Sequence, residues 1–199
     1  MKLINILNKT TVLALFMIGS TLSAQQDNMS NSMDMKEEMT KMVGGAAMYP
    51  SKDIVSNAVN SKDHTTLVAA VKAADLVETL QGPGPFTVFA PTNNAFDKLP
   101  EGTVATLLEA ENKAKLQGVL TYHVLAGKFS AADIVAAIKK GMGKAEFTTV
   151  NGGKISAMLK GENVVLKDAN GNTAKVTIAD VNQSNGVIHV VDAVVLPGM

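Results

Sequence analysis

The chain of 199 residues contains no cysteine, no tryptophan and, among its 18 basic residues, no arginine. Without cysteine, no disulfide can crosslink the fold and no lipid can be attached through a thiol, so burial alone must hold the core. Without arginine, the chain lacks the planar fork that grips phosphate or carboxylate at two points. Because there is no run of basic residues either, nucleic acid is not an expected partner.

Aromatic side chains are also scarce, at 4% of the chain, and the tyrosines are Tyr49 and Tyr122. An aromatic platform that stacks sugars or bases is therefore not expected. The sequence also lacks the Gly-x-Ser-x-Gly turn of serine hydrolases, a phosphate-binding loop ending in Gly-Lys-Ser or Gly-Lys-Thr, and a dinucleotide-binding glycine motif. We predict that the protein is not an enzyme and needs no cofactor.

The first 24 residues have the pattern of a signal peptide. Lys2 and Lys9 give a positive start, residues 11–19 are an apolar run too short to cross a bilayer, and small residues lead up to Ala24. We expect cleavage near Ala24, export to the periplasm or the extracellular space, and no transmembrane anchor. Cleavage would remove two lysines and no acid, which leaves a mature chain with a net charge of −2.

Residues 25–48 form a polar leader that holds six of the eleven methionines. The leader is short of core-forming residues, so we predict a flexible linker or a marginal helix that ends at Gly44-Gly45. An alternative hypothesis is Cu(I) binding, because thioether sulfur is a soft ligand and the pairs Met29/Met33 and Met35/Met39 are four residues apart. No histidine or cysteine in the leader supports such a site, and we expect no other metal site.

The N-terminal half of the remaining chain has helical character. Apolar residues recur every three to four positions through residues 50–80, and two Gly-Pro pairs then end the pattern. Thr92 is placed to cap a short helix, and Ser130 and Asp133 form a capping pair for a later one. The expected elements are two helices within 50–80, a strand at Phe86–Phe89, helices at 92–99, 103–120 and 130–140, and a short strand at Tyr122–Leu125.

From Glu146 onward, apolar residues alternate with polar ones, which is the period of β-strands. Asn-Gly pairs that begin at 151, 170 and 185, and a glycine turn at 161–163, divide this region into hairpins. The last segment, Val187–Leu196, is almost entirely apolar, which indicates a strand buried on both faces. We therefore predict one α+β domain over residues 49–199, with a helical N-terminal half packed on a hairpin-rich sheet.

The histidines are His64, His123 and His189, and they are too far apart in sequence for a local metal motif. We expect His64 to be solvated or to cap a helix, and His189 to be buried, neutral and hydrogen-bonded. His123 follows Tyr122 on a short strand. Either the pair presents a surface to a partner, or the two side chains point to opposite faces and at least one of them fills the core. Residues 168–172 place oxygen ligands at alternate positions but lack the spacing of a calcium loop, so a hairpin turn is expected.

Three segments carry a family resemblance. They read FTVFAPTNNAF at Phe86–Phe96, YHVLAG at Tyr122–Gly127 and NGVIHVVDAVVLP at Asn185–Pro197. In this order they resemble the first motif, the Tyr-His segment and the second motif of the fasciclin domain family, from about Tyr49 to the C-terminus. The resemblance implies a single β-wedge domain in which the N-terminal helices pack on a sheet that includes both motif strands. It also implies an extracellular adhesion or protein-interaction role without established catalysis.

Two pairs of residues can be carried over from that family. Tyr122-His123 match the Tyr-His segment that is implicated in integrin binding by animal members. Asp180-Val181 occupy the place of an Asp-Ile adhesion pair, with valine in place of isoleucine and Ala179 in place of a preceding proline. The resemblance thus predicts a monomeric module that binds a protein or a matrix component through Tyr122, His123, Asp180 and Val181.

Overall fold

Strands β3 (Phe86–Pro91) and β9 (Gly186–Val191) lie side by side in the structure, a computed structural model that describes residues 40–198. The two strands pair in parallel, from Phe86 opposite Gly186 to Pro91 opposite Val191. Every residue of β9 is buried. A Cβ atom on Gly186 would lie 2.2 Å from the carbonyl oxygen of Phe86, so this close pairing requires glycine. The prediction that the apolar last strand is buried in one body with the Phe86 strand is confirmed.

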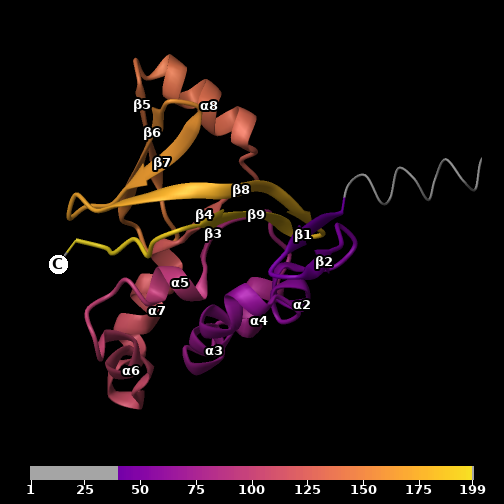
Figure 1. The fold of residues 1–199 in the computed structure, drawn as a ribbon, viewed down its shortest axis with the longest axis vertical. Coiled ribbons are helices and arrows are strands. Elements are labelled where there is room, and N and C mark those ends of the chain that lie inside the picture. Colours follow the sequence, from indigo (N-terminus) through magenta and orange to yellow (C-terminus); the bar gives the residue numbers. More distant parts are fainter. Residues whose placement is uncertain (1–39, 199) are drawn as a thin grey trace, which may run out of the picture. The chain divides into compact units, whose positions relative to one another are not determined.

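These strands belong to a seven-stranded sheet in the order β4-β3-β9-β8-β7-β6-β5 (Figure 1). The other neighbouring strands pair antiparallel. The sheet curves so that its two edge strands, β4 and β5, come together. Leu125 of β4 forms a bridge with Thr149, just beyond β5, and the Val150 N–H donates to the Val124 carbonyl oxygen at 2.8 Å. The further strands are β4 (Val124–Ala126), β5 (Lys144–Thr148), β6 (Lys154–Lys160), β7 (Asn163–Lys167) and β8 (Thr173–Gln183).

Strand β8 links the two parts of the curved sheet. It pairs with β7 through its first residues and with β9 along the rest of its length. Its register shifts between Val176 and Ile178 and again between Ile178 and Val181. Asp180 lies in the second irregularity with a φ of 55°, a value that few residues with a side chain adopt. Such bulges bend a strand, which allows β8 to serve both neighbours.

Helix α8 (Ala131–Lys140) lies beside β5–β7 in Figure 1, whereas the helices from α2 to α7 lie on the other side of β8 and β9. The predicted capping box is present, since the Asp133 N–H donates to Ser130 Oγ at 3.2 Å and the Ser130 N–H donates to Asp133 Oδ2 at 2.8 Å. The other helices are α2 (Ile54–Ala58), α3 (Thr65–Ala73), α4 (Val77–Gln81), α5 (Asn93–Phe96), α6 (Thr103–Leu108) and α7 (Lys113–Tyr122), with short 3-10 turns at Lys62–His64 and Ala110–Asn112.

Several elements differ from the prediction: residues 50–80 hold three helices, α2, α3 and α4, where two were expected, and β3 extends beyond Phe89 to Pro91. Helix α5 ends at Phe96 and not at Leu99, a residue whose helical backbone the following Pro100 disfavours. Tyr122 is the last residue of α7, and β4 begins only at Val124, so the strand predicted at Tyr122–Leu125 is wrong at its start. Strand β9 ends at Val191, although Val194 and Val195 beyond it remain buried.

The ordered domain begins before Tyr49. Strands β1 (Lys41–Val43) and β2 (Ala46–Met48) form a hairpin across Gly44-Gly45, whose φ angles of 57° and 75° suit glycine. Val43 and Met48 are each 2% exposed and belong to the core formed with α2 and α3. The prediction of a flexible leader is therefore wrong for residues 41–48. Two apolar side chains on one face of this short hairpin pack it against the core.

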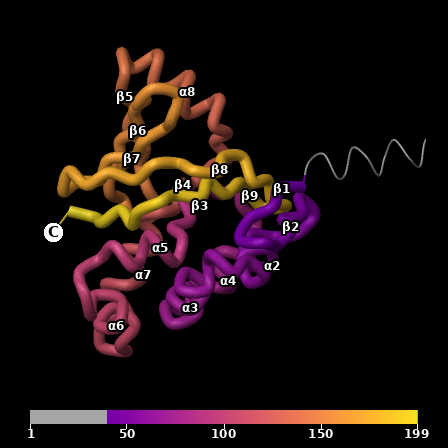
Figure 2. Tube along the Cα trace, in the orientation of Figure 1, coloured from indigo at the N-terminus to yellow at the C-terminus, as the bar shows by residue number. Residues whose placement is uncertain are grey.

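Apolar side chains form two clusters, one on each side of the paired strands. The first includes residues of α2, α3 and α7 together with Val88 of β3 and Ile188 of β9. The second includes residues of α8 and β5–β8 together with Phe89 of β3 and Val191 of β9. Figure 2 shows the trace of β3 and β9 passing between the two groups of elements. Over residues 40–198, no helix has the length and apolar character needed to cross a membrane.

Candidate functional site

Tyr122, the first residue of the predicted contact pair, lies inside the domain. Its side chain has no exposed surface at the end of α7. The hydroxyl group donates to the Lys154 carbonyl oxygen at 2.6 Å and accepts from the Ala169 N–H at 3.2 Å. Burial raises the pKa of the Tyr122 phenol. The ring therefore joins α7 to β6 and to the β7–β8 turn, and in this arrangement it cannot contact a partner.

His123, the second residue of that pair, is 3% exposed. Its Nδ1 atom lies 2.8 Å from the Val119 carbonyl oxygen, and its Nε2 atom accepts from the Val195 N–H at 3.2 Å. These partners fix the neutral ring with its proton on Nδ1. Burial lowers the pKa of His123 to about 4. Of the two arrangements open to the pair, facing a partner or filling the core, the structure has the second for both residues.

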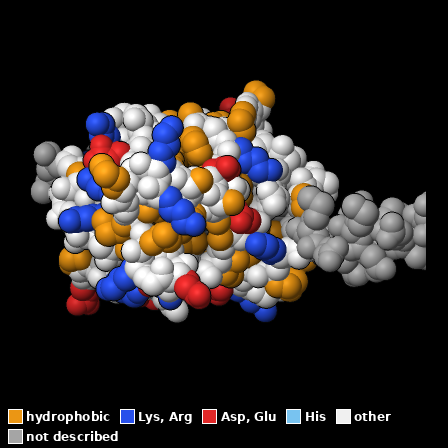
Figure 3. Space-filling model, turned by 90° about the horizontal axis from the view of Figure 1, so that it is seen from above, with side chains coloured by type: hydrophobic (Ala, Val, Ile, Leu, Met, Phe, Trp, Pro, Cys, Tyr) orange, Lys and Arg blue, Asp and Glu red, His pale blue; other side chains and the backbone are white. Residues whose placement is uncertain are grey.

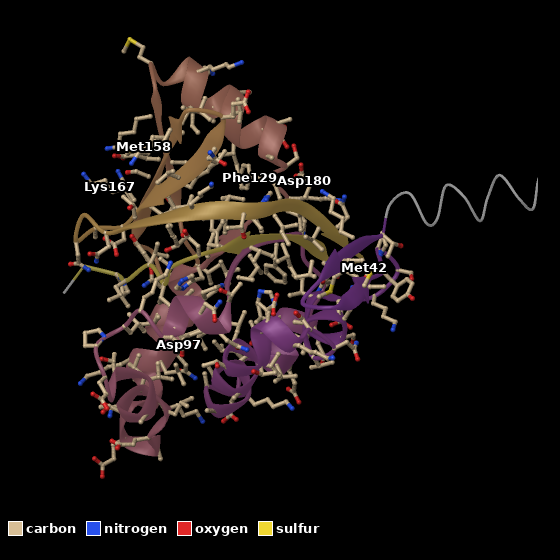
Figure 4. All side chains as sticks on the ribbon, viewed as in Figure 1. Met42, Asp97, Phe129, Met158, Lys167 and Asp180 are labelled. Carbon is tan, nitrogen blue, oxygen red and sulfur yellow. The ribbon has the colours of Figure 1, made fainter. Side chains whose placement is uncertain are left out.

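The Asp180-Val181 pair is divided between two environments. Val181 is 1% exposed and belongs to the core of the helical side. Asp180 is half-buried, and its Oδ1 atom accepts from the Ala131 N–H, the first residue of α8, at 2.7 Å. Figure 4 labels Asp180 and Phe129 close together, where the chain enters α8. The carboxylate thus anchors the start of α8 to the bulge of β8.

His189 is buried and hydrogen-bonded, as predicted. Its Nε2 atom lies 2.9 Å from the Phe129 carbonyl oxygen, and its Nδ1 atom accepts from the Asp180 N–H at 3.3 Å. The ring stacks on Phe89 with 5.8 Å between the ring centroids. Burial lowers the pKa of His189, so the ring is neutral. It ties β9 to β8 and to the segment before α8.

His64 differs from its prediction. It lies at the start of α3, but it is 2% exposed and its side chain caps no helix. Its Nδ1 atom lies 2.9 Å from Ser61 Oγ, whereas Nε2 has no hydrogen-bond partner. Burial lowers the pKa of His64. The hairpin β1–β2 covers this ring, because Val43 and Met48 line a cavity of about 10 Å³ beside it.

The predicted hairpin turn at residues 168–172 is present and contains a buried acid whose partners the sequence does not reveal. Asp168 is 6% exposed. Its carboxylate accepts from the Asn170 and Asn172 N–H groups at 2.9 and 2.8 Å and from the Leu196 N–H at 3.0 Å. The bond to Leu196 connects residues 28 positions apart. Asp168 therefore fastens the C-terminal segment to the β7–β8 turn instead of binding a cation.

Comparisons with known proteins bear on the identity of this arrangement. The family model for the fasciclin domain matches residues 62–197, more than half of the chain. The chain belongs to the fasciclin domain family. The match includes both motif strands, the Tyr-His segment and the three histidines described above. The β1–β2 hairpin and α2 precede the matched range.

Relatives of this fasciclin protein include bacterial chains of similar length. Protein sll1483 of Synechocystis is 48% identical over 166 residues, which cover 81% of this chain and 83% of that protein. The cell surface glycolipoprotein MPB83 of Mycobacterium bovis is 32% identical over 161 residues, which cover 78% of this chain and 64% of that protein. A fasciclin domain pair from the insect cell adhesion molecule Fasciclin I has the same fold, with a TM-score of 0.66 at 19% identity over 74% of this chain and 52% of that one.

The fasciclin domain also contains an apolar cavity of about 70 Å³ between its helical side and β3. The lining comes from α2, α3, α4, α7 and β3, and His123 is the histidine that touches it. Both nitrogens of that ring already have partners, and the other titratable side chain of the lining is the exposed Lys72. Among residues 40–198, no group of three or more His, Asp or Glu side chains could hold a metal ion. Met29, Met33, Met35 and Met39 lie outside the described residues, so Cu(I) binding stays a prediction.

Proposed function

We propose that the protein is an exported, non-catalytic adhesion module that binds a protein or a matrix component through the outer surface of its fasciclin domain. One observation carries the proposal: the polar motif residues Tyr122, His123 and His189 are buried, and their polar atoms bond to backbone groups of the same domain. Groups held in this way maintain the fold, whereas general acid–base catalysis needs a proton-transferring group within reach of a substrate. Recognition is thereby left to exposed side chains.

Export and adhesion are supported from two directions. The pattern of residues 1–24 is that of a signal peptide, and MPB83, a relative, is a cell surface protein. One solved structure that shares the fold comes from a cell adhesion molecule. The lack of cysteine means that the domain keeps its fold in reducing and oxidising compartments alike.

Binding to the surface of the producing cells tests this proposal. The labelled mature chain is applied to intact cells and to the material released from their surface, beside an unrelated exported domain of matched size and charge. We expect saturable binding that unlabelled protein displaces. Binding no greater than that of the unrelated domain would refute the proposal. Hydrolase activity that is found in a broad substrate screen and co-purifies with the protein would also refute it.

A further inference from the structure

The outward face of strands β5–β8 carries a set of lysines. Side chains of these strands alternate between the second core cluster and the outside, and the inward residues include Ile155, Leu166 and Ala174, none with exposed surface. The lysines on the outward face are all exposed. We call this surface the lysine face, and its lysines are Lys144, Lys154, Lys160, Lys167 and Lys175.

The strand register places three of these lysines on a straight line. Ser156 of β6 lies opposite Lys167 of β7, so Lys154, two residues before Ser156, is a diagonal neighbour of Lys167. Lys167 lies opposite Thr173 of β8, so Lys175, two residues after Thr173, continues the same diagonal. Diagonal neighbours in a sheet are about 7–8 Å apart. Lys154, Lys167 and Lys175 therefore project from neighbouring positions along one diagonal of the sheet, and we call these three residues the lysine diagonal.

Acidic side chains neutralise only part of this face. Glu146, the outward acid of the four strands, lies 2.9 Å from the Lys144 Nζ atom and 3.6 Å from the Lys154 Nζ atom. Lys160, Lys167 and Lys175 form no ion pair with any residue in 40–198. At the borders, Glu162 lies in the β6–β7 turn, and the Asp192 carboxylate accepts from the Lys175 backbone N–H at 2.8 Å. The face keeps a positive excess in a chain with no net charge.

The chemistry of the other outward residues limits the class of partner that can bind this face. They are mostly small and polar, namely Thr148, Ser156, Asn163 and Thr173, with Met158 and Val165 between them and no aromatic residue. Figure 4 marks Met158 and Lys167 on this part of the sheet, and Figure 3 views the domain from the end where α8 and β5 lie, with lysines projecting at several points. Protein interfaces favour buried aromatic anchors and are poor in lysine, so this face does not suit a folded protein partner.

We infer that the lysine diagonal binds a linear acidic polysaccharide, whose carboxylate or sulfate groups follow one another along an extended chain. A row of separate ammonium groups matches a row of single anions, and the neighbouring hydroxyl and amide side chains can hydrogen-bond sugar hydroxyls. Binding of this kind needs no aromatic stacking platform, which the chain lacks. This inference rests on the proposed function, because it names the class of matrix component that the exported module would meet.

The test measures binding of the full mature chain to polygalacturonate, dextran sulfate and neutral dextran by isothermal titration calorimetry. We expect both acidic polymers to bind and neutral dextran not to bind. The variant K154Q/K167Q/K175Q should bind about tenfold more weakly or worse, as expected for three charge contacts. A control, K62Q/K72Q/K115Q, removes the same charge from exposed lysines of the helical side and should change the affinity less than about twofold.

Several outcomes would overturn the inference. They are no binding to either acidic polymer, an equal loss in the two triple variants, or tighter binding to phosphatidylglycerol vesicles than to the polymers. Because all six substituted lysines are exposed, both variants should keep the circular dichroism spectrum of the parent chain. Failure of the proposed function is distinguishable: a chain that binds cell-surface material but no acidic polymer contradicts this inference alone, whereas a chain that binds acidic polymers but not cell-surface material contradicts the adhesion proposal.

Discussion

The hydroxyl group of Tyr122 donates a 2.6 Å hydrogen bond to the backbone carbonyl oxygen of Lys154. Through this bond a family motif residue holds β6 from the inside, while the Lys154 side chain projects from the outward face of the same strand. The relationship separates two tasks in the domain. Motif residues such as Tyr122 position the strands, and the exposed side chains of those strands are available for recognition.

Removal of the Tyr122 hydroxyl should reduce stability. The variant Y122F leaves the Lys154 carbonyl oxygen and the Ala169 N–H without their partner in a buried setting, which costs about 1–3 kcal/mol. Urea unfolding should show a lower midpoint with an unchanged slope. The matched control is Y49F, because Tyr49 is 42% exposed, and it should shift the unfolding free energy by less than about 0.5 kcal/mol.

The protein should lose stability as the pH falls through the range in which the His123 ring is neutral in the folded state but protonated in the unfolded state. The pKa of His123 in the folded state is about 4, below the ordinary histidine pKa of 6.5. Between these values the unfolded chain binds a proton that the folded chain does not, so the contribution is full above pH 6.5 and is lost towards pH 4. The loss is about 3 kcal/mol.

Urea unfolding at a series of pH values checks this expectation. The variant H123Q should be less stable at neutral pH and should show a smaller decrease on acidification. Burial also lowers the pKa of His64 and of His189, so part of the pH dependence should remain in that variant. If the unfolding free energies of the parent and of H123Q change with pH in parallel, protonation of His123 does not contribute to the pH dependence, and the expectation is wrong.

The β1–β2 hairpin should contribute to the stability of the domain. The variant M48A removes most of a side chain that is 2% exposed and should cost about 2–4 kcal/mol. Met42, in the same hairpin, is 62% exposed, so M42A should cost less than about 0.5 kcal/mol. Thermal unfolding of the two variants distinguishes a packed hairpin from a loose leader, in which both substitutions would have equally small effects.

Asp168 should be important for the attachment of the C-terminal segment. In D168A the N–H groups of Asn172 and Leu196 lose their acceptor, with an expected cost of about 2 kcal/mol or more. Hydrogen exchange at Leu196 should become faster, because its N–H is no longer bonded. The exposed Asp97 provides the control, and D97A should leave both the exchange rate and the stability nearly unchanged.

Features that depend on local chemistry could be predicted from the sequence. The Ser130–Asp133 capping box, the Asn-Gly turns and the burial of Val187–Val191 each follow from a few neighbouring residues. The neutral, bonded state of His189 also follows, because a histidine within an apolar strand must find partners in the core.

Features that depend on long-range contacts could not be predicted. Tyr122 and His123 are buried because α7 extends to Tyr122 and the C-terminal segment covers the end of that helix, with Val195 bonded to His123. The burial of His64 depends on the β1–β2 hairpin, whose Val43 and Met48 lie beside the ring. The polar, methionine-rich sequence of that segment does not predict a hairpin. The lysine diagonal becomes visible only through the register of β6, β7 and β8, since its members are up to 21 positions apart in the sequence.

The most direct test of the division between scaffold and surface is the affinity of Y122F for cell-surface material, measured at a temperature where circular dichroism shows the variant to be folded. We predict an affinity equal to that of the parent chain, because Tyr122 has no exposed surface. Loss of binding by Y122F at a temperature where the variant is folded would contradict the account and would place Tyr122 in the contact surface.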